Sequence, residues 1–191
     1  MYDVVAIGEL LVDFACRSTD DDGYPVLAAH PGGAPANFLA VLARYGLKTA
    51  LLAKVGNDAF GRLLRRTMER EGIDTAGVVV DDAAFTTLAF VTLDENGERD
   101  FSFARKPGAD MLLRYDELDL SLIDRTRVFH FGSVSMTDEP SRDATRRAAA
   151  YARSRGGLLT YDPNLRIPLW KDLAQARQEM LWGLSMADVV K

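Results

Sequence analysis

Short apolar segments alternate along this chain with longer segments that are apolar on one side only. The apolar segments are rich in Val, Ile and Leu, which is typical of strands buried in a parallel sheet. Their alternation with helical patterns predicts strand-helix-strand units. We therefore expect an α/β fold with a doubly wound, mostly parallel sheet that helices cover on both faces. The expected core strands are 3–12, 49–55, 77–80, 127–132, 158–161 and 187–191.

Helix signals mark the ends of the longer segments. Phe38, Val41, Leu42 and Tyr45 recur at helical spacing, and the glycine that follows them is a common helix stop. Other helical patterns begin after a Thr, Asn or Asp, residues that cap helix amino termini. The expected helices are 34–45, Asn57 or Asp58 to Gly72, Thr137 or Asp138 to about Arg155, and roughly 172–183.

One region departs from this alternation. Two β-like runs, 86–93 and 99–104, are joined by a segment that contains Asn96-Gly97, the strongest short signal for a hairpin. No helical pattern covers this hairpin. Together with further strands in 14–30, the segment 85–105 predicts a small β-sheet lid on a domain that spans 1–191. Closing such a lid excludes water and completes a site.

Composition narrows the class of protein. Of 191 residues, 48% are hydrophobic and 27% are charged, as in soluble globular proteins. The net charge of −5 argues against a nucleic-acid partner, and no segment approaches the ~18 consecutive apolar residues of a membrane span. The first residues lack the basic region and cleavage site of a signal peptide, and Cys16 has no partner for an internal disulfide. We therefore expect a cytoplasmic protein.

Two segments carry candidate ligand-binding groups. Asp13 follows the first expected strand, at the edge of an open sheet where ligands bind, and its carboxylate suits two hydroxyls of a sugar; the alternative is a turn aspartate. Gly32-Gly33 precede a helix and let a ligand approach the backbone, while Asn37 lies one turn further; a purely structural turn is the alternative. His30 and His130 lack nucleophile partners, so packing is the expected role for both.

Five motifs in register carry a resemblance to a known family. They are Gly8-Glu9 leading to Asp13, Gly32-Gly33 leading to Asn37, Lys54 to Gly61, Arg105 to Asp110, and Asp162 to Arg166. In order and spacing they resemble the ribokinase-like carbohydrate kinases over essentially the whole chain. The stretches Phe129 to Ser133, Glu139 to Ser141 and Asp162 to Trp170 are most similar to the fructokinase branch.

The resemblance implies a doubly wound body with a β lid, and a sugar bound between them. It implies that Asp13, Gly32, Gly33 and Asn37 bind sugar hydroxyls and that Asn164 shapes the site. Phe101 or Phe103 would stack on the sugar, and Arg105 would continue their face of the lid strand, unless it is a solvated arginine. Arg166 would offset phosphoryl charge, and Asp162 would reach a metal through water.

The implied activity is ATP-dependent phosphorylation of a sugar, most simply fructose to fructose 6-phosphate, with Mg²⁺ and, as an option, a monovalent cation. A homodimer formed through the lid is a further expectation. Family members continue beyond the strand that ends at Lys191 into segments that supply the anion hole and the aspartate base. We therefore expect an amino-terminal portion that is inactive alone. The alternatives are a 2-keto-3-deoxygluconate kinase and a non-catalytic, truncated sugar-binding fragment.

Overall fold

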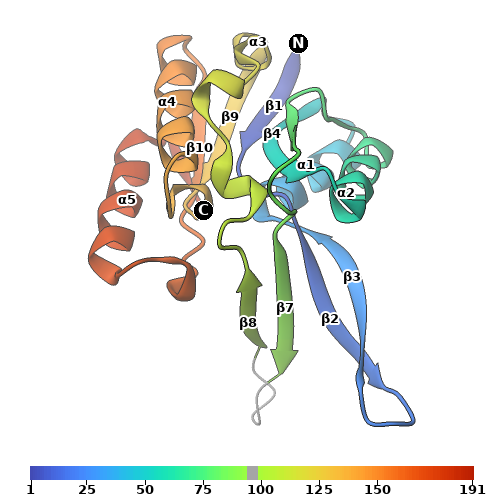
Figure 1. The fold of residues 1–191 in the computed structure, drawn as a ribbon. Helices are drawn as coiled ribbons and strands as arrows, with labels where there is room; N and C mark the ends of the chain where they lie inside the picture. Colours follow the sequence, from blue (N-terminus) through green and yellow to red (C-terminus); the bar gives the residue numbers. More distant parts are fainter. Residues whose placement is uncertain (94–98) are drawn as a thin grey trace.

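The computed structural model of the protein describes residues 1–93 and 99–191. It shows a body of helices packed on a central sheet and a narrow sheet that projects from one end of the body (Figure 1). The amino terminus lies at the opposite end of the body, so the carboxyl ends of the central strands point toward the projecting sheet.

The central sheet is parallel and contains seven strands in the described part of the chain. Their order is β11-β10-β9-β1-β4-β5, and β6 also pairs with β4. The strands are β1 (Tyr2–Ile7), β4 (Thr49–Gly56), β5 (Ile73–Asp74), β6 (Val78–Asp81), β9 (Thr126–Gly132), β10 (Leu158–Asp162) and β11 (Val189–Val190).

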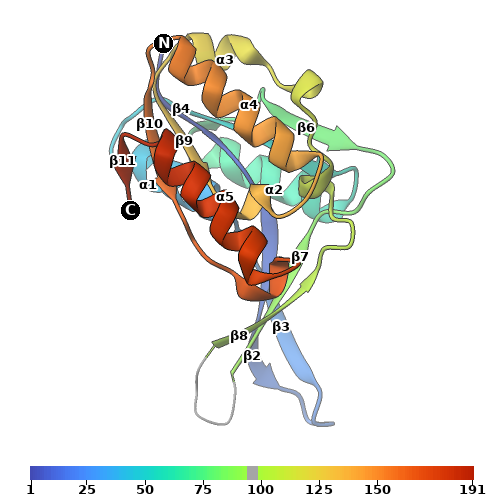
Figure 2. The ribbon, with the colours of Figure 1, turned by 90° about the vertical axis from the view of Figure 1, so that its left-hand side faces the viewer.

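Helices cover both faces of this sheet, as the alternation of apolar segments predicts (Figure 2). On β1, Val5 and Ile7 belong to the core beneath α3, α4 and α5, whereas Val4 and Ala6 belong to the core beneath α1 and α2. Successive side chains of a strand point to opposite faces, so one buried strand contributes to both cores. The helices are α1 (Ala34–Arg44), α2 (Ala59–Arg70), α3 (Leu120–Asp124), α4 (Ser141–Ser154) and α5 (Leu173–Met186), with short 3-10 helices at Ala109–Leu112, Tyr115–Glu117, Val134–Met136 and Ile167–Leu169.

The projecting sheet confirms the expected lid strands. Its order is β3-β2-β7-β8, and it consists of β2 (Leu11–Thr19), β3 (Pro25–Gly32), β7 (Leu88–Leu93) and β8 (Arg99–Ala104). The two outer pairs are antiparallel and β2 pairs with β7 in parallel. The expected Asn96-Gly97 turn lies outside the described residues.

Three expected boundaries are wrong. The first strand does not run through 3–12: β1 ends at Ile7, Gly8 has a φ of 156°, and β2 leaves to form the lid. The helix expected from Thr137 or Asp138 begins only at Ser141, because a 3-10 turn precedes it. The expected strand 187–191 shortens to Val189–Val190, which lie exposed at the sheet edge.

Side-chain caps mark the amino termini of α2 and α5. Asp58, and not Asn57, caps α2: its Oδ1 accepts hydrogen bonds from the amides of Phe60 and Gly61, both at 2.8 Å. Asp172 caps α5 through the amide of Gln175 at 2.7 Å. Within the described ranges, none of the helices has both the length and the apolar character that a membrane span requires.

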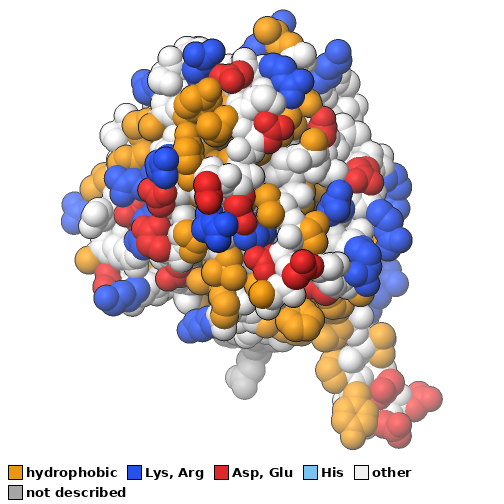
Figure 3. Space-filling model, turned by 45° about the horizontal axis from the view of Figure 1, so that its top comes forward, with side chains coloured by type: hydrophobic (Ala, Val, Ile, Leu, Met, Phe, Trp, Pro, Cys, Tyr) orange, Lys and Arg blue, Asp and Glu red, His pale blue; other side chains and the backbone are white. Residues whose placement is uncertain are grey.

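Basic and acidic side chains are interspersed over the face of the body seen in Figure 3. Acidic side chains also gather at the tip of the lid, where Asp20, Asp21 and Asp22 are exposed between β2 and β3.

Candidate functional site

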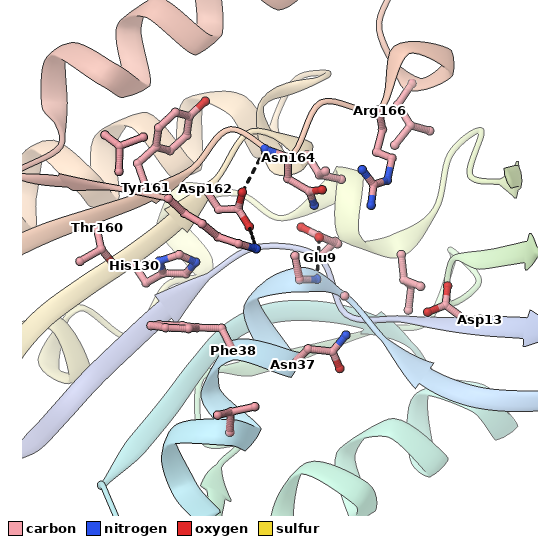
Figure 4. A pocket seen from close by; sticks show the side chains of 18 of the residues that line it. Glu9, Asp13, Asn37, Phe38, His130, Thr160, Tyr161, Asp162, Asn164 and Arg166 are labelled. Atoms are coloured by element: carbon pink, nitrogen blue, oxygen red, sulfur yellow. Dashed lines mark hydrogen bonds and ion pairs between the residues drawn. The ribbon is translucent and has the colours of Figure 1, made fainter. Parts of the chain in front are cut away.

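A pocket of about 860 Å³ lies where the central sheet meets the lid. Its walls come from β2, the amino terminus of α1, β8 and the segment that follows β10 (Figure 4). It therefore lies at the carboxyl ends of parallel strands, the usual ligand-binding edge of an open α/β sheet. The residues that line it include Glu9, Asp13, Gly33, Asn37, Phe38, Phe101, Phe103, His130, Asp162, Asn164, Arg166 and Lys191.

Asp13 reaches this pocket from the lid strand β2, and not from the end of a central strand as the sequence indicated. Its partner across the sheet is His30. Burial raises the pKa of Asp13 above its usual value, and the nearby His30 and Arg166 oppose that shift. The carboxylate lies over Gly32, where a β-carbon would be only 2.3 Å from Oδ2. Gly32 therefore makes room for Asp13 and does not itself line the pocket.

Gly33 and Asn37 form the adjoining wall. Gly33 has a φ of 111°, and a β-carbon there would lie 2.3 Å from the backbone oxygen of Glu9. Only glycine fits this close approach without strain. The turn leads into α1, where Asn37 is exposed and lines the pocket (Figure 4). Its side-chain amide suits a ligand that donates and accepts hydrogen bonds.

Two aromatic rings and an arginine form the side of the pocket that faces the lid. The rings of Phe101 and Phe103 are nearly parallel, with centroids 6.2 Å apart, and both line the pocket. The guanidinium of Arg166 lies over the ring of Phe101, with Cζ 5.6 Å from its centroid. Arg166 is thus placed by the loop after β10 next to the lid, although the two segments are far apart in the sequence.

Asp162 lies at the end of β10 and interacts with two groups of the protein. Its Oδ1 accepts a hydrogen bond from the backbone amide of Asn164 at 3.1 Å, and its Oδ2 pairs with Lys191 Nζ at 3.0 Å. Asn164 adopts a φ of 28°, which aims this loop back toward the pocket. Within 1–93 and 99–191, no three His, Cys, Asp or Glu side chains lie close enough together to hold a metal ion. A role for Asp162 near a metal, through water, stays a prediction.

Arg105 is neither on the pocket wall nor solvated, so both expectations for it are wrong. It follows β8 and is only 4% exposed. Its Nε donates to Asp110 Oδ2 at 2.8 Å and its Nη1 donates to Thr137 Oγ1 at 2.9 Å. Thr87, just before β7, donates to the other oxygen of Asp110. The Arg105–Asp110 pair therefore connects the start of β7 and the end of β8 to the body of the protein.

The two histidines differ. His130 is buried, as expected: its ring lies 4.3 Å from that of Phe38, and its Nδ1 is 2.8 Å from Thr160 Oγ1. Burial lowers its pKa to about 4. It also borders the pocket, which the sequence pattern did not indicate. The packing role expected for His30 is wrong, because His30 is exposed on β3.

The sequence pattern also passed over Glu9 as a site residue. The signal was present, since a carboxylate interrupts the apolar residues of 4–12. Glu9 is 4% exposed, and burial raises its pKa to about 7. Its Oε1 accepts a hydrogen bond from the backbone amide of Ala34 at 3.0 Å, so it lies directly beneath the glycine turn (Figure 4).

The family model described as "pfkB family carbohydrate kinase" matches residues 1–191. The chain belongs to this family. Fructokinase-1 of Zea mays is 46% identical over 190 residues, which are 98% of this chain and 59% of the relative. The chain thus spans little more than half the length of the curated relatives that it matches. The expected resemblance to fructokinases over the amino-terminal portion is confirmed.

Solved structures agree with the fold. The crystal structure of fructokinase from Xylella fastidiosa superposes with a TM-score of 0.93 at 34% identity, covering 100% of this chain and 59% of that one. An uncharacterized sugar kinase from Pyrococcus horikoshii in complex with ATP gives a TM-score of 0.90 at 30% identity, covering 98% and 62%. The expected ribokinase-like fold with a small lid sheet is therefore confirmed.

Proposed function

We propose that this chain supplies the sugar-binding portion of an ATP-dependent fructokinase, which forms fructose 6-phosphate. One observation carries the proposal: a carboxylate from the lid, an amide side chain from α1 and two aromatic rings converge on one pocket. Carboxylates and amides bind the hydroxyls of a polyol, and rings cover its apolar face. The identity to plant fructokinases supports fructose as the sugar.

The charges of the pocket favour a neutral sugar over a sugar acid. The carboxylate of 2-keto-3-deoxygluconate would be an anionic partner for arginines such as Arg105 and Arg166. Arg105 instead pairs with Asp110 outside the pocket, which leaves Arg166 as the arginine among the residues that line it. Asp13 and Glu9 line the same wall, so a substrate carboxylate would meet negative neighbours.

Arg166 is the residue that we propose to act on the phosphoryl group. Its guanidinium would offset negative charge on the transferring phosphoryl, which bound ATP supplies. Asn164, on the same loop, would hold the sugar near that charge. We assign no general base within this chain. Binding of Mg²⁺, a requirement for a monovalent cation, the cytoplasmic location and a dimer formed through the lid stay predictions.

The proposal is tested by fructose binding to Asp13→Asn. The variant keeps the shape of the side chain and loses the charged acceptor, so the dissociation constant measured by calorimetry should rise on the order of 10- to 100-fold. Asp20→Asn, at the exposed lid tip, is the matched control and should bind as the wild type does. Equal affinities of the Asp13 and Asp20 variants would remove Asp13 from the site. Preference for a sugar acid over fructose would overturn the substrate.

A further inference from the structure

Glu9 is a buried carboxyl to which the proposed function assigns no role. It lies between β1 and β2, where the chain leaves the central sheet for the lid, and it borders the pocket. Its side chain is directed at the amino terminus of α1 in Figure 4. A carboxyl group is costly to bury, so its place at this junction calls for a compensating interaction.

That interaction is made with the first amide of α1. The helix has no acidic residue in its own first turn, and its cap residue, Gly33, has no side chain with which to accept a hydrogen bond. Glu9 supplies the missing acceptor from a distant part of the chain, through the 3.0 Å hydrogen bond from Ala34 to Oε1. A negative charge is also favourable at a helix amino terminus.

The backbone of Glu9 also contacts the glycine turn. Its backbone oxygen lies so close to Gly33 that a β-carbon there would be 2.3 Å away. Its Oε2 is buried and has no hydrogen-bond partner within the described residues. Glu9 thus contacts the turn through both its backbone and its side chain, and it has one oxygen on which a proton can reside.

We propose that Glu9 is a positioning residue of the sugar site, whose carboxylate fixes the Gly33–Ala34 turn and the first turn of α1 in the geometry that binds the sugar. The hydrogen bond to Ala34 is stronger when the carboxyl is ionised, because charge-assisted hydrogen bonds are roughly twice as strong as neutral ones. Protonation of Glu9 loosens the turn that carries Gly33 and Asn37. Sugar binding therefore strengthens as Glu9 ionises. This inference rests on the proposed function only for the identity of the ligand.

The surroundings of Glu9 place its ionisation near neutral pH. Burial raises its pKa to about 7, whereas the amide of Ala34 and the charge of Arg105 oppose that rise and Asp110 adds to it. Arg105 and Asp110 lie at the root of the lid, where their charges act on Glu9. The other charged or titratable groups among the described residues of the pocket are Asp13 on β2, His130 on β9, Tyr161 and Asp162 on β10, Arg166 and Lys191. His130, with a pKa of about 4, titrates below the range of interest.

The first experiment needs no ligand. In the backbone amide NMR spectrum, the Ala34 signal of the wild type should shift with pH between about pH 5 and about pH 8, with a midpoint near the pKa of about 7. Glu9→Gln keeps a neutral acceptor for Ala34 and should abolish the shift. An Ala34 signal that moves equally in both proteins would overturn the inference, whatever ligand the pocket binds.

The second experiment measures fructose binding by calorimetry at about pH 6 and about pH 8. The wild type should bind about three- to tenfold more tightly at the higher pH. Glu9→Gln should show no pH dependence and should match the wild type at about pH 6, while Glu9→Ala should bind more weakly than either. Retained pH dependence in Glu9→Gln would refute the inference. If the wild type binds no fructose at any pH, the proposed sugar is wrong, and the NMR result still decides the role of Glu9.

Discussion

Removal of the Asp110 carboxylate should destabilise the protein more than removal of any exposed carboxylate. The side chains of Asp110 and Arg105 are each 2% exposed, and the guanidinium Nη2 lies 2.8 Å from Oδ2. Asp110→Ala would leave the Arg105 cation buried, and its hydrogen-bond partners among the described residues would then be Thr137 Oγ1 and the backbone oxygen of Val134. It would also leave the Thr87 hydroxyl without its acceptor. Breaking a buried ion pair from one side costs about 3–5 kcal/mol.

Urea unfolding of the purified chain measures this cost, and thermal unfolding should show a fall in Tm of roughly 6–20 °C. Asp116→Ala is the matched control, since Asp116 pairs with Arg114 on the surface, where the two side chains are 74% and 57% exposed. Such a pair contributes about 0–1 kcal/mol. The double variant Asp110→Ala, Arg105→Met should be more stable than Asp110→Ala, because it no longer buries an unpaired charge. A loss below about 1 kcal/mol for Asp110→Ala, equal to the control, would refute the reasoning.

Two further predictions concern pH and the glycine turn. His130 has a folded pKa of about 4 against a usual 6.5, so the unfolded chain binds the proton first and stability falls as the pH drops below about 6.5. Between about pH 7 and about pH 4.5, the wild type should lose about 2–3 kcal/mol more than His130→Asn in urea unfolding; parallel losses would contradict this. The effect of Glu9 on the pH dependence of stability has the opposite sign. Its pKa is raised in the folded protein, so its contribution to stability falls as the pH rises from about 4.5 through about 7. Both proteins compared must therefore keep Glu9. Gly33→Ala should lower stability and fructose affinity more than Gly156→Ala does. Gly156 also has a left-handed φ, 79°, but there is open space around it, so its substitution should cost only about 1–2 kcal/mol. Equal costs would show that the approach of Glu9 to Gly33 is not constrained.

Much of the fold could be read from local patterns. Apolar runs gave the central strands because a strand buried on both faces must be apolar throughout, and the caps at Asp58 and Asp172 mark where helices begin. The break between β1 and β2 could not be read in this way. The residues of 4–12 are apolar almost without interruption, since the lid strand is also buried at its root, and the periodicity gives no sign that the chain leaves one sheet for another.

The candidate site, too, could be predicted only in part from local patterns. Asp13, Gly33 and Asn37 stand in short motifs whose residue types already indicate ligand binding, and the structure brings them to one pocket. Arg105 was misplaced because strand alternation gives the face of a side chain but not its partner. That partner, Asp110, comes from the turn after the lid, and a buried guanidinium is stable only where a carboxylate meets it.

The sequence by itself determined the α/β class, the lid, the family and the residue types of a sugar site. The tertiary structure decided which carboxylates and cations meet: Arg166 with Phe101, Arg105 with Asp110, and Glu9 with the amide of Ala34. Local patterns arise from contacts between neighbours in the chain. The first and third pairs join segments that meet only when the sheet, its helices and the lid pack together, and the Arg105–Asp110 pair, five residues apart, is buried only by that packing. Burial then determines the charge of a group such as Glu9, because the cost of ionisation depends on the water and the partners that the fold leaves around it.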